Sequence, residues 1–242
     1  MESVKHESDS FFADLKVGVV IPAAGSGQRM GGRSKQFLQL AGLPVLKHVL
    51  NMFKNRSWVI DIVVSLPQAQ YEEPPEWLSE EPEVRTVLGG ASRRDSVWNA
   101  IQTFSDDLDL ILVHDGARPL TPQKTILDCV NLAANGFGAV AGVRVVDTLK
   151  KTDNADRVLG TQEREDLWRA QTPQVFPYTV LLDAYQKAIQ NNLDASDDSI
   201  IVEKVGGQVR MVESSPLNFK VTVPADLDFA EAVLNYYRSR TG

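Results

Sequence analysis

Short apolar runs of strand length alternate along this chain with stretches whose apolar residues recur at helical intervals. The strand-like runs, rich in β-branched residues, lie at residues 16–21, 59–65, 84–88 and 110–114. Between them, residues 44–53 and 92–104 place apolar side chains every three or four positions, which predicts crossover helices. This alternation is typical of βαβ units, so we expect an α/β fold with a mostly parallel sheet flanked by helices.

The regular alternation breaks in the second half of the chain. Residues 140–146 predict a fifth strand, but residues 147–169 are polar, charged and β-prone, with no helical period. Such a departure inside a compact fold usually marks a functional or interface excursion, so we predict a protruding β arm at 147–169. The later elements expected are a helix at 177–190, an N-cap at Ser196, strands at 209–212 and 218–221, and a helix from Pro224 to about residue 238.

Composition narrows the class of protein. Of the 242 residues, 43% are hydrophobic and 24% are charged, as in ordinary globular domains, which excludes disordered, collagen-like and coiled-coil classes. A single hydrophobic core can reach this size, so we take residues 1–242 as one domain that carries the arm. A (β/α)₈ barrel would also fit the length, but the clean βα units are too few.

Charge and special residues restrict the partners and the compartment. The formal net charge of −7 disfavours nucleic-acid binding, although a small anionic substrate needs only a local cluster of cations. No apolar run approaches the roughly 18 residues of a membrane span, and the acidic N-terminal segment does not resemble a targeting signal. The single cysteine, Cys129, cannot form an internal disulfide, which favours a reducing cytoplasm.

The loop after the first strand is the first candidate for ligand binding. Gly25 and Gly27 allow backbone N–H groups to approach an anion, and Arg29 and Lys35 add two cations, which suits a triphosphate. A dinucleotide fingerprint would need glycine where Met30 stands, and the loop lacks the Gly-Lys-Ser/Thr ending of a Walker A motif. By itself, the loop fits a phosphate nest and an ordinary tight turn equally well.

A second loop with glycines and basic residues follows the third strand. Gly90 and Arg93 lie there, together with the hydroxyl residues Ser92 and Ser96. Because the carboxyl ends of parallel strands meet at one edge of a sheet, we expect this loop to share a crevice with the first. Taken alone, it also fits a plain helix cap at Ser92 with Arg93 in water.

The loop after the fourth strand supplies a candidate metal ligand. Asp115 ends that strand, where a carboxylate could hold a Mg²⁺ ion that bridges nucleotide phosphates. Arg118 offers a planar fork for a second phosphate. The alternative is a turn in which Asp115 caps its own loop and Gly116 takes a positive φ. We expect His114 to be a packed structural residue, and we assign it no role in binding or catalysis.

Taken in order, these motifs resemble one family. They are Pro22-Ala23-Ala24-Gly25-x-Gly27-x-Arg29-Met30, Lys35-Gln36, Gly89-Gly90-x-x-Arg93-x-Asp95-Ser96-Val97, His114-Asp115-x-Ala117-Arg118-Pro119, Asp147-Thr148-x-Lys150, Leu167-Trp168, Thr172-Pro173-Gln174 and Lys220-Val221-Thr222. The chain resembles the 2-C-methyl-D-erythritol 4-phosphate cytidylyltransferases. The resemblance implies a Rossmann-like nucleotidyltransferase fold and transfer of CMP from CTP to the substrate phosphate, with release of diphosphate, in non-mevalonate isoprenoid precursor synthesis.

The resemblance also implies a role for each matching residue. Arg29 and Lys35 would stabilise the transition state, and Arg164 and Lys220 would position the sugar phosphate. The nucleotide would be held by Ala23, Ala24, Gly90, Arg93 and Ser96, beside the phosphate nest of Gly25 and Gly27. The substrate and metal region would contain Asp115, Arg118, Thr148 and Thr172, with Mg²⁺ or another divalent cation as cofactor. Gly116 departs from the alanine that the family commonly has.

The family also implies a homodimer, and several alternatives stay open. The arm at 147–169 would reach the neighbouring subunit, so that Arg164 could serve the partner's site. A ribitol 5-phosphate cytidylyltransferase would share the nucleotide site, and a regulatory module would bind nucleotide without turnover. A glycosyltransferase is disfavoured because Asp107 and Asp109 precede the fourth strand instead of following it.

One physical argument supports phosphate chemistry without reference to the family. The chain shows no Ser-His-Asp set, no reactive thiol and no clear catalytic histidine. A phosphate monoester, whose second pKa lies near 6, is already ionised at neutral pH and needs no base to become a nucleophile. Catalysis then requires cations that stabilise the phosphates, and the loops supply these.

Overall fold

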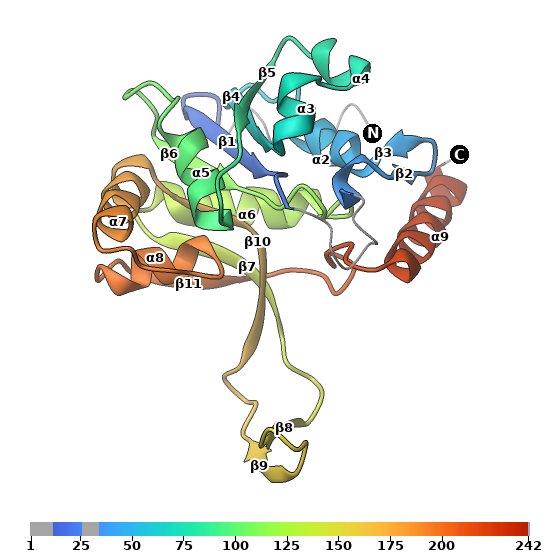
Figure 1. Ribbon diagram of the computed structural model, residues 1–242, viewed down its shortest axis with the longest axis vertical. Coiled ribbons are helices and arrows are strands. Elements are labelled where there is room, and N and C mark those ends of the chain that lie inside the picture. Colours follow the sequence, from blue (N-terminus) through green and yellow to red (C-terminus); the bar gives the residue numbers. More distant parts are fainter. Residues whose placement is uncertain (1–11, 26–33, 242) are drawn as a thin grey trace.

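This computed structural model describes residues 12–25 and 34–241. One sheet of seven strands forms its centre, and Figure 1 shows helices on both sides of it. Neighbouring strands are parallel except at β10, which runs antiparallel to both of its neighbours. In sheet order the strands are β11 (Val209–Glu213), β7 (Gly138–Arg144), β10 (Trp168–Pro177), β6 (Leu110–Val113), β1 (Val17–Pro22), β4 (Val59–Leu66) and β5 (Val84–Leu88). The prediction of a mostly parallel sheet flanked by helices is confirmed.

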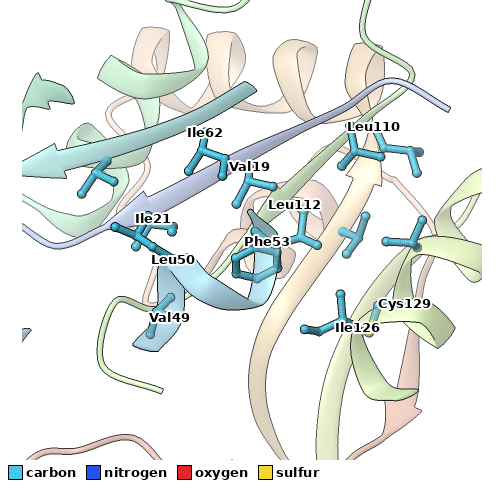
Figure 2. Close-up of a cluster of buried hydrophobic side chains, with 14 of the residues drawn as sticks. Val19, Ile21, Val49, Leu50, Phe53, Ile62, Leu110, Leu112, Ile126 and Cys129 are labelled. Carbon is cyan, nitrogen blue, oxygen red and sulfur yellow. The ribbon is translucent and has the colours of Figure 1, made fainter. Parts of the chain in front are cut away.

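Helices cover both faces of the sheet because the central strands are apolar on both sides. On one face, Val19 and Ile21 of β1 pack against Leu50 and Phe53, and Figure 2 shows this cluster. The other face packs its apolar side chains against a second layer of helices. The helices are α2 (Val45–Phe53), α3 (Gln68–Glu72), α4 (Glu76–Ser79), α5 (Arg93–Ile101), α6 (Gln123–Ala134), α7 (Tyr178–Gln190), α8 (Asp198–Lys204) and α9 (Pro224–Thr241). A short 3₁₀ turn, η2 (Lys35–Phe37), precedes the hairpin of β2 (Gln39–Leu40) and β3 (Leu43–Pro44).

The two faces follow from the side-chain alternation of the strands. Val20 of β1 and Ile111 of β6 point away from the α2 side and pack with α5, α7 and α8. Val19 of β1 and Leu112 of β6 point toward α2 and α6. Burial of these side chains fixes the register of the strands, and therefore places the loops that follow β1, β5 and β6 at one edge.

The predicted arm is an excursion between β7 and β10. Its tip is a separate antiparallel pair of strands, β8 (Leu149–Thr152) and β9 (Val158–Gln162), and every residue of both strands is exposed. Figure 1 shows this pair projecting away from the main sheet. At the base of the arm, the Arg144 guanidinium lies over the Trp168 ring, 4.6 Å from its centroid.

Several sequence predictions were wrong in detail. The N-cap of α8 is Asp197, whose side chain accepts a hydrogen bond from the backbone N–H of Ile200, and not Ser196. Residues 218–221 form no strand, because the Asn218 side chain and a Val221 hydrogen bond anchor the segment individually. Helix α6 and strand β10 were not predicted. Among residues 12–25 and 34–241, no helix has the length and apolar character that a bilayer crossing requires.

Candidate functional site

Three loops meet at the carboxyl edge of the sheet. A Cβ atom built on Gly89, in the loop after β5, would lie only 2.1 Å from the Ala24 Cβ atom in the loop after β1. Glycine is therefore required for these two loops to touch. Ala23 is fixed from two sides, since its N–H donates to Ser65 O at 2.9 Å and its carbonyl accepts from Gln36 Nε2 at 2.7 Å.

The loop between β5 and α5 is held by its own hydroxyl groups. Ser92 caps α5 by accepting from the Asp95 N–H at 3.1 Å, as its position predicted. The buried Ser96 hydroxyl accepts from the Gly90 N–H at 3.1 Å and donates to Ser92 O at 2.9 Å. A side chain on Gly90 would collide with Asp95, 2.3 Å from its Cβ atom. The Gly90 backbone is therefore rigid, which suits close contact with a ligand.

Four side chains from distant parts of the chain form what we call the Asp115 cluster, namely Asp115, Arg93, Arg118 and Lys220. Lys220 Nζ lies 3.0 Å and Arg118 Nε 3.2 Å from Asp115 Oδ2, and Arg93 Nε lies 3.5 Å from Oδ1. Asp115 is only 6% exposed, whereas the Lys220 side chain is 38% exposed. The cluster thus places three cations around one buried carboxylate at the crevice.

Titration of this region follows from the same contacts. Burial by itself would raise the pKa of Asp115, but the charges of Lys220, Arg93 and Arg118 overcome it and hold the pKa well below its usual range. Burial lowers the pKa of His114 to about 4. At neutral pH, Asp115 is therefore charged and His114 is neutral.

Hydrogen bonds fix the orientation of the neutral His114 ring. Its Nε2 lies 3.2 Å from Arg118 O, which can only accept, so Nε2 carries the proton. Nδ1 then accepts from the Thr172 hydroxyl at 3.0 Å, and the same Thr172 oxygen accepts from the Asp115 N–H at 3.0 Å. Thr172 and His114 together orient the backbone at Asp115.

Behind the cluster lies a second buried carboxylate. Asp198, which is 0% exposed, accepts from Arg93 Nη2 at 2.7 Å and from the Tyr185 hydroxyl at 2.5 Å. The backbone N–H of Asp198 donates to Gln174 Oε1 at 3.0 Å. Burial raises the pKa of Tyr185 well above its usual value, and the nearby Asp198 charge raises it further. Arg93 is consequently held between two carboxylates.

A buried asparagine holds the segment that carries Lys220. Asn218 Nδ2 donates to Thr172 O at 2.9 Å and to Gln171 Oε1 at 3.0 Å, and Asn218 Oδ1 accepts from the Thr121 hydroxyl at 2.7 Å. The Asn218 carbonyl accepts from Arg118 Nη1 at 2.7 Å. These bonds connect the segment around 218–220 to β10 and to the loop after β6, and so direct Lys220 toward Asp115.

The predicted site residues separate into four groups. The structure brings together Ala23, Ala24, Gly25, Gly90, Arg93, Ser96, Asp115, Arg118, Thr172 and Lys220 in the loops described above and their supports. Lys35 lies in η2, beside the Gln36 side chain that bonds Ala23. Thr148 and Arg164 lie on the exposed arm, where Arg164 Nη1 donates to Val146 O at 2.6 Å. Gly27 and Arg29 lie outside the described residues.

Asp115 does not fit the role of a metal ligand in this arrangement. Both of its oxygens face guanidinium or ammonium groups, which a divalent cation would have to displace. In the part of the chain that the structure describes, no group of three or more His, Cys, Asp or Glu side chains is placed to hold a metal. The turn alternative is also wrong in one respect, because Gly116 is not among the described glycines with positive φ.

Sequence reasoning missed four supporting residues: Thr121, Gln174, Asp198 and Asn218. Gln174 stands in the Thr172-Pro173-Gln174 motif, and its place in that motif was the available signal for it. Asp198 was assigned no role from the sequence. Its role depends on contacts with Arg93 and Tyr185 that no local pattern reveals.

Comparisons of the sequence and of the structure with known proteins point to the same family. Residues 17–236 match the family of 2-C-methyl-D-erythritol 4-phosphate cytidylyltransferases. The enzyme of that name from Halalkalibacterium halodurans is 40% identical over 225 residues, covering 91% of this chain and 97% of that protein. The one from Clostridioides difficile is 37% identical over 221 residues, covering 90% and 93%. The crystal structure of the Thermus thermophilus enzyme superimposes with a TM-score of 0.78 at 34% identity, covering 90% and 98%.

Proposed function

This chain belongs to the 2-C-methyl-D-erythritol 4-phosphate cytidylyltransferase family, and from that premise we propose the reaction that it catalyses. It transfers CMP from CTP to 2-C-methyl-D-erythritol 4-phosphate, giving 4-diphosphocytidyl-2-C-methyl-D-erythritol and diphosphate. The observation that carries the proposal is the Asp115 cluster, which places three cations beside the rigid Gly90 loop. Two phosphorylated substrates that must approach each other require this kind of electrostatic support.

The residues suggest a direct displacement. The substrate phosphate attacks the α-phosphorus of CTP in line with the departing diphosphate, and no side chain forms a covalent intermediate. Lys220, on the half-exposed side of the cluster, and Arg118 neutralise the entering phosphate. Arg29 and Lys35 stabilise charge on the α-phosphate and the leaving diphosphate. Inversion at an isotopically chiral α-phosphorus is expected, and net retention would contradict this mechanism.

A divalent cation, with Mg²⁺ the expected one, belongs to the proposal as a partner of the triphosphate. Because the oxygens of Asp115 are already occupied by cations, we assign the metal's ligands to the nucleotide phosphates and not to this carboxylate. The metal would supply charge neutralisation on the triphosphate.

The arm supports a homodimer as the active form. The apolar side chains of Val146, Val158 and Leu159 are 70%, 61% and 62% exposed to water. Contact with a second copy of the chain would bury them, which is favourable. Thr148 and Arg164 lie on this arm, outside the Asp115 cluster of their own chain. We propose that they complete the substrate site of the partner subunit, and that the enzyme works in the cytoplasm.

The reaction is tested by diphosphate release from CTP and Mg²⁺ with 2-C-methyl-D-erythritol 4-phosphate, beside ribitol 5-phosphate and a sample without acceptor. Release with the first acceptor alone is expected. Release with ribitol 5-phosphate alone would keep the mechanism but move the protein to the related activity. CTP binding without release in any sample would favour the regulatory alternative.

A further inference from the structure

A carboxylate that no substrate reaches holds one arginine of the crevice. Asp198 is completely buried at the first residue of α8, and its two oxygens are used by two groups only, Arg93 and Tyr185, among the described residues. Such a carboxylate cannot touch a ligand directly. Its influence on the site must pass through Arg93.

The contacts of Arg93 show what this influence would be. Arg93 is the first residue of α5, next to the Ser92 cap and the Gly90 loop. Its Nη2 donates to Asp198 at 2.7 Å, and its Nε lies 3.5 Å from Asp115, so the planar guanidinium is oriented by two carboxylates at a fixed angle. The side chain as a whole remains 23% exposed, so part of it faces the crevice where a ligand would lie.

The carboxylate is itself oriented by two neighbouring elements, α7 and β10. Tyr185 of α7 donates to Oδ1, and Gln174 of β10 accepts from the backbone N–H groups of Asp198 and Ser199 at 3.0 and 2.9 Å. Gln174 Nε2 also donates to the Asp197 cap at 3.2 Å. The start of α8 is therefore fixed to the sheet by bonds that do not involve Arg93.

We propose that Asp198, oriented by Tyr185 and Gln174, is a positioning residue that aims Arg93 at the phosphates of the bound nucleotide. This inference rests on the proposed function, because it assumes that CTP occupies the crevice. Without the Asp198 charge, Arg93 would turn toward Asp115, its remaining partner 3.5 Å away, and would present a different edge of the guanidinium to the nucleotide.

The test measures the affinity for CTP in a double-mutant cycle of Asp198→Asn and Arg93→Gln, by titration calorimetry without acceptor. Asp198→Asn is expected to weaken CTP binding about tenfold, as for the loss of a charge-assisted contact. In the Arg93→Gln background, the same substitution is expected to change the affinity less than about threefold. Equal effects in both backgrounds, or an unchanged affinity in Asp198→Asn, would overturn the proposal.

Two further variants keep the test independent of folding. Tyr185→Phe removes only the hydroxyl that orients Asp198, and it should raise the KM for CTP severalfold while kcat changes less. A purely structural role would lower the melting temperature and leave the KM unchanged, which would overturn the proposal. Asp183→Asn, which removes an exposed partner of Lys187 on the same helix, is the matched control and should match the wild type.

The failure of the function and the failure of this inference can be told apart. Wild-type protein that binds CTP but releases no diphosphate with either acceptor would count against the proposed reaction. The affinity cycle would still decide whether Asp198 acts through Arg93, because it measures binding and not turnover.

Discussion

Removing the Asp115 charge should destabilise the protein as well as disturb its site. In Asp115→Asn, three cations keep their places while the anion between them is lost. Within residues 12–25 and 34–241, Arg93 alone of the three retains a carboxylate partner, Asp198. Breaking a buried ion pair by removing one partner costs about 3–5 kcal/mol. Because Lys220 is 38% exposed and can turn into water, we expect a smaller loss than this range, about 2–3 kcal/mol.

Urea unfolding and thermal melts measure this loss. For a chain of this size, a change of about 2–3 kcal/mol corresponds to a fall of roughly 5–10 °C in the melting temperature. Asp128→Asn, which removes an exposed partner of Lys124, is the control and should stay within about 0.5 kcal/mol of the wild type. Inorganic phosphate should restore part of the lost stability, because an anion between the cations replaces the carboxylate. If Asp115→Asn unfolded at the wild-type urea concentration, our account of the cluster would be refuted.

Two other predictions concern the groups beside Asp115. The buried His114 has a pKa of about 4 in the folded protein and about 6.5 when unfolded. Between these two pH values, the unfolded chain is protonated at His114 and the folded protein is not. The contribution of neutral His114 to the free energy of unfolding is complete above about pH 6.5 and is lost as the pH falls toward 4. The total loss is about 3 kcal/mol. Urea unfolding curves that do not change between pH 7 and pH 4.5 would contradict this. Thr172→Val leaves the Asp115 N–H and His114 Nδ1 without their shared partner and should cost about 2 kcal/mol, whereas Thr172→Ser should recover most of it. Equal stability of the valine and serine variants would refute the bridging role.

The fold could be predicted where one physical pattern dominates a segment. Strands β1 and β6 are apolar runs that are buried almost throughout, and β4 and β5 are rich in β-branched residues; the limits of all four were predicted to within one residue. Strand β10 was missed because Gln171, Thr172 and Gln174 interrupt its apolar pattern, and polar residues in sequence read as a loop. In the folded protein each of them is buried and hydrogen-bonded. These hydrogen bonds offset the free-energy cost of burying polar side chains in a strand.

The site could be predicted only in its parts. Glycines and cations after β1, β5 and β6 marked the crevice because the carboxyl ends of parallel strands converge, whatever the length of chain between them. The partners of Asp115 could not be predicted in this way. Lys220 follows no strand, and its direction depends on the side-chain bonds of Asn218 to β10, which exist only after the whole sheet has formed.

The two carboxylates of the site should affect anion binding in opposite directions. Asp115 lies at the crevice and uses the same cations that a phosphate would use, so it competes with the ligand while it keeps those cations close together. Asp198 is completely buried behind Arg93, so a phosphate in the crevice would not meet it and the two would not compete. Asp115→Asn should therefore bind inorganic phosphate more tightly than the wild type, whereas Asp198→Asn should bind it more weakly. Phosphate titrations of the folded variants would show this, and a change of the same sign in both would mean that net charge alone, and not the position of each carboxylate, governs the site.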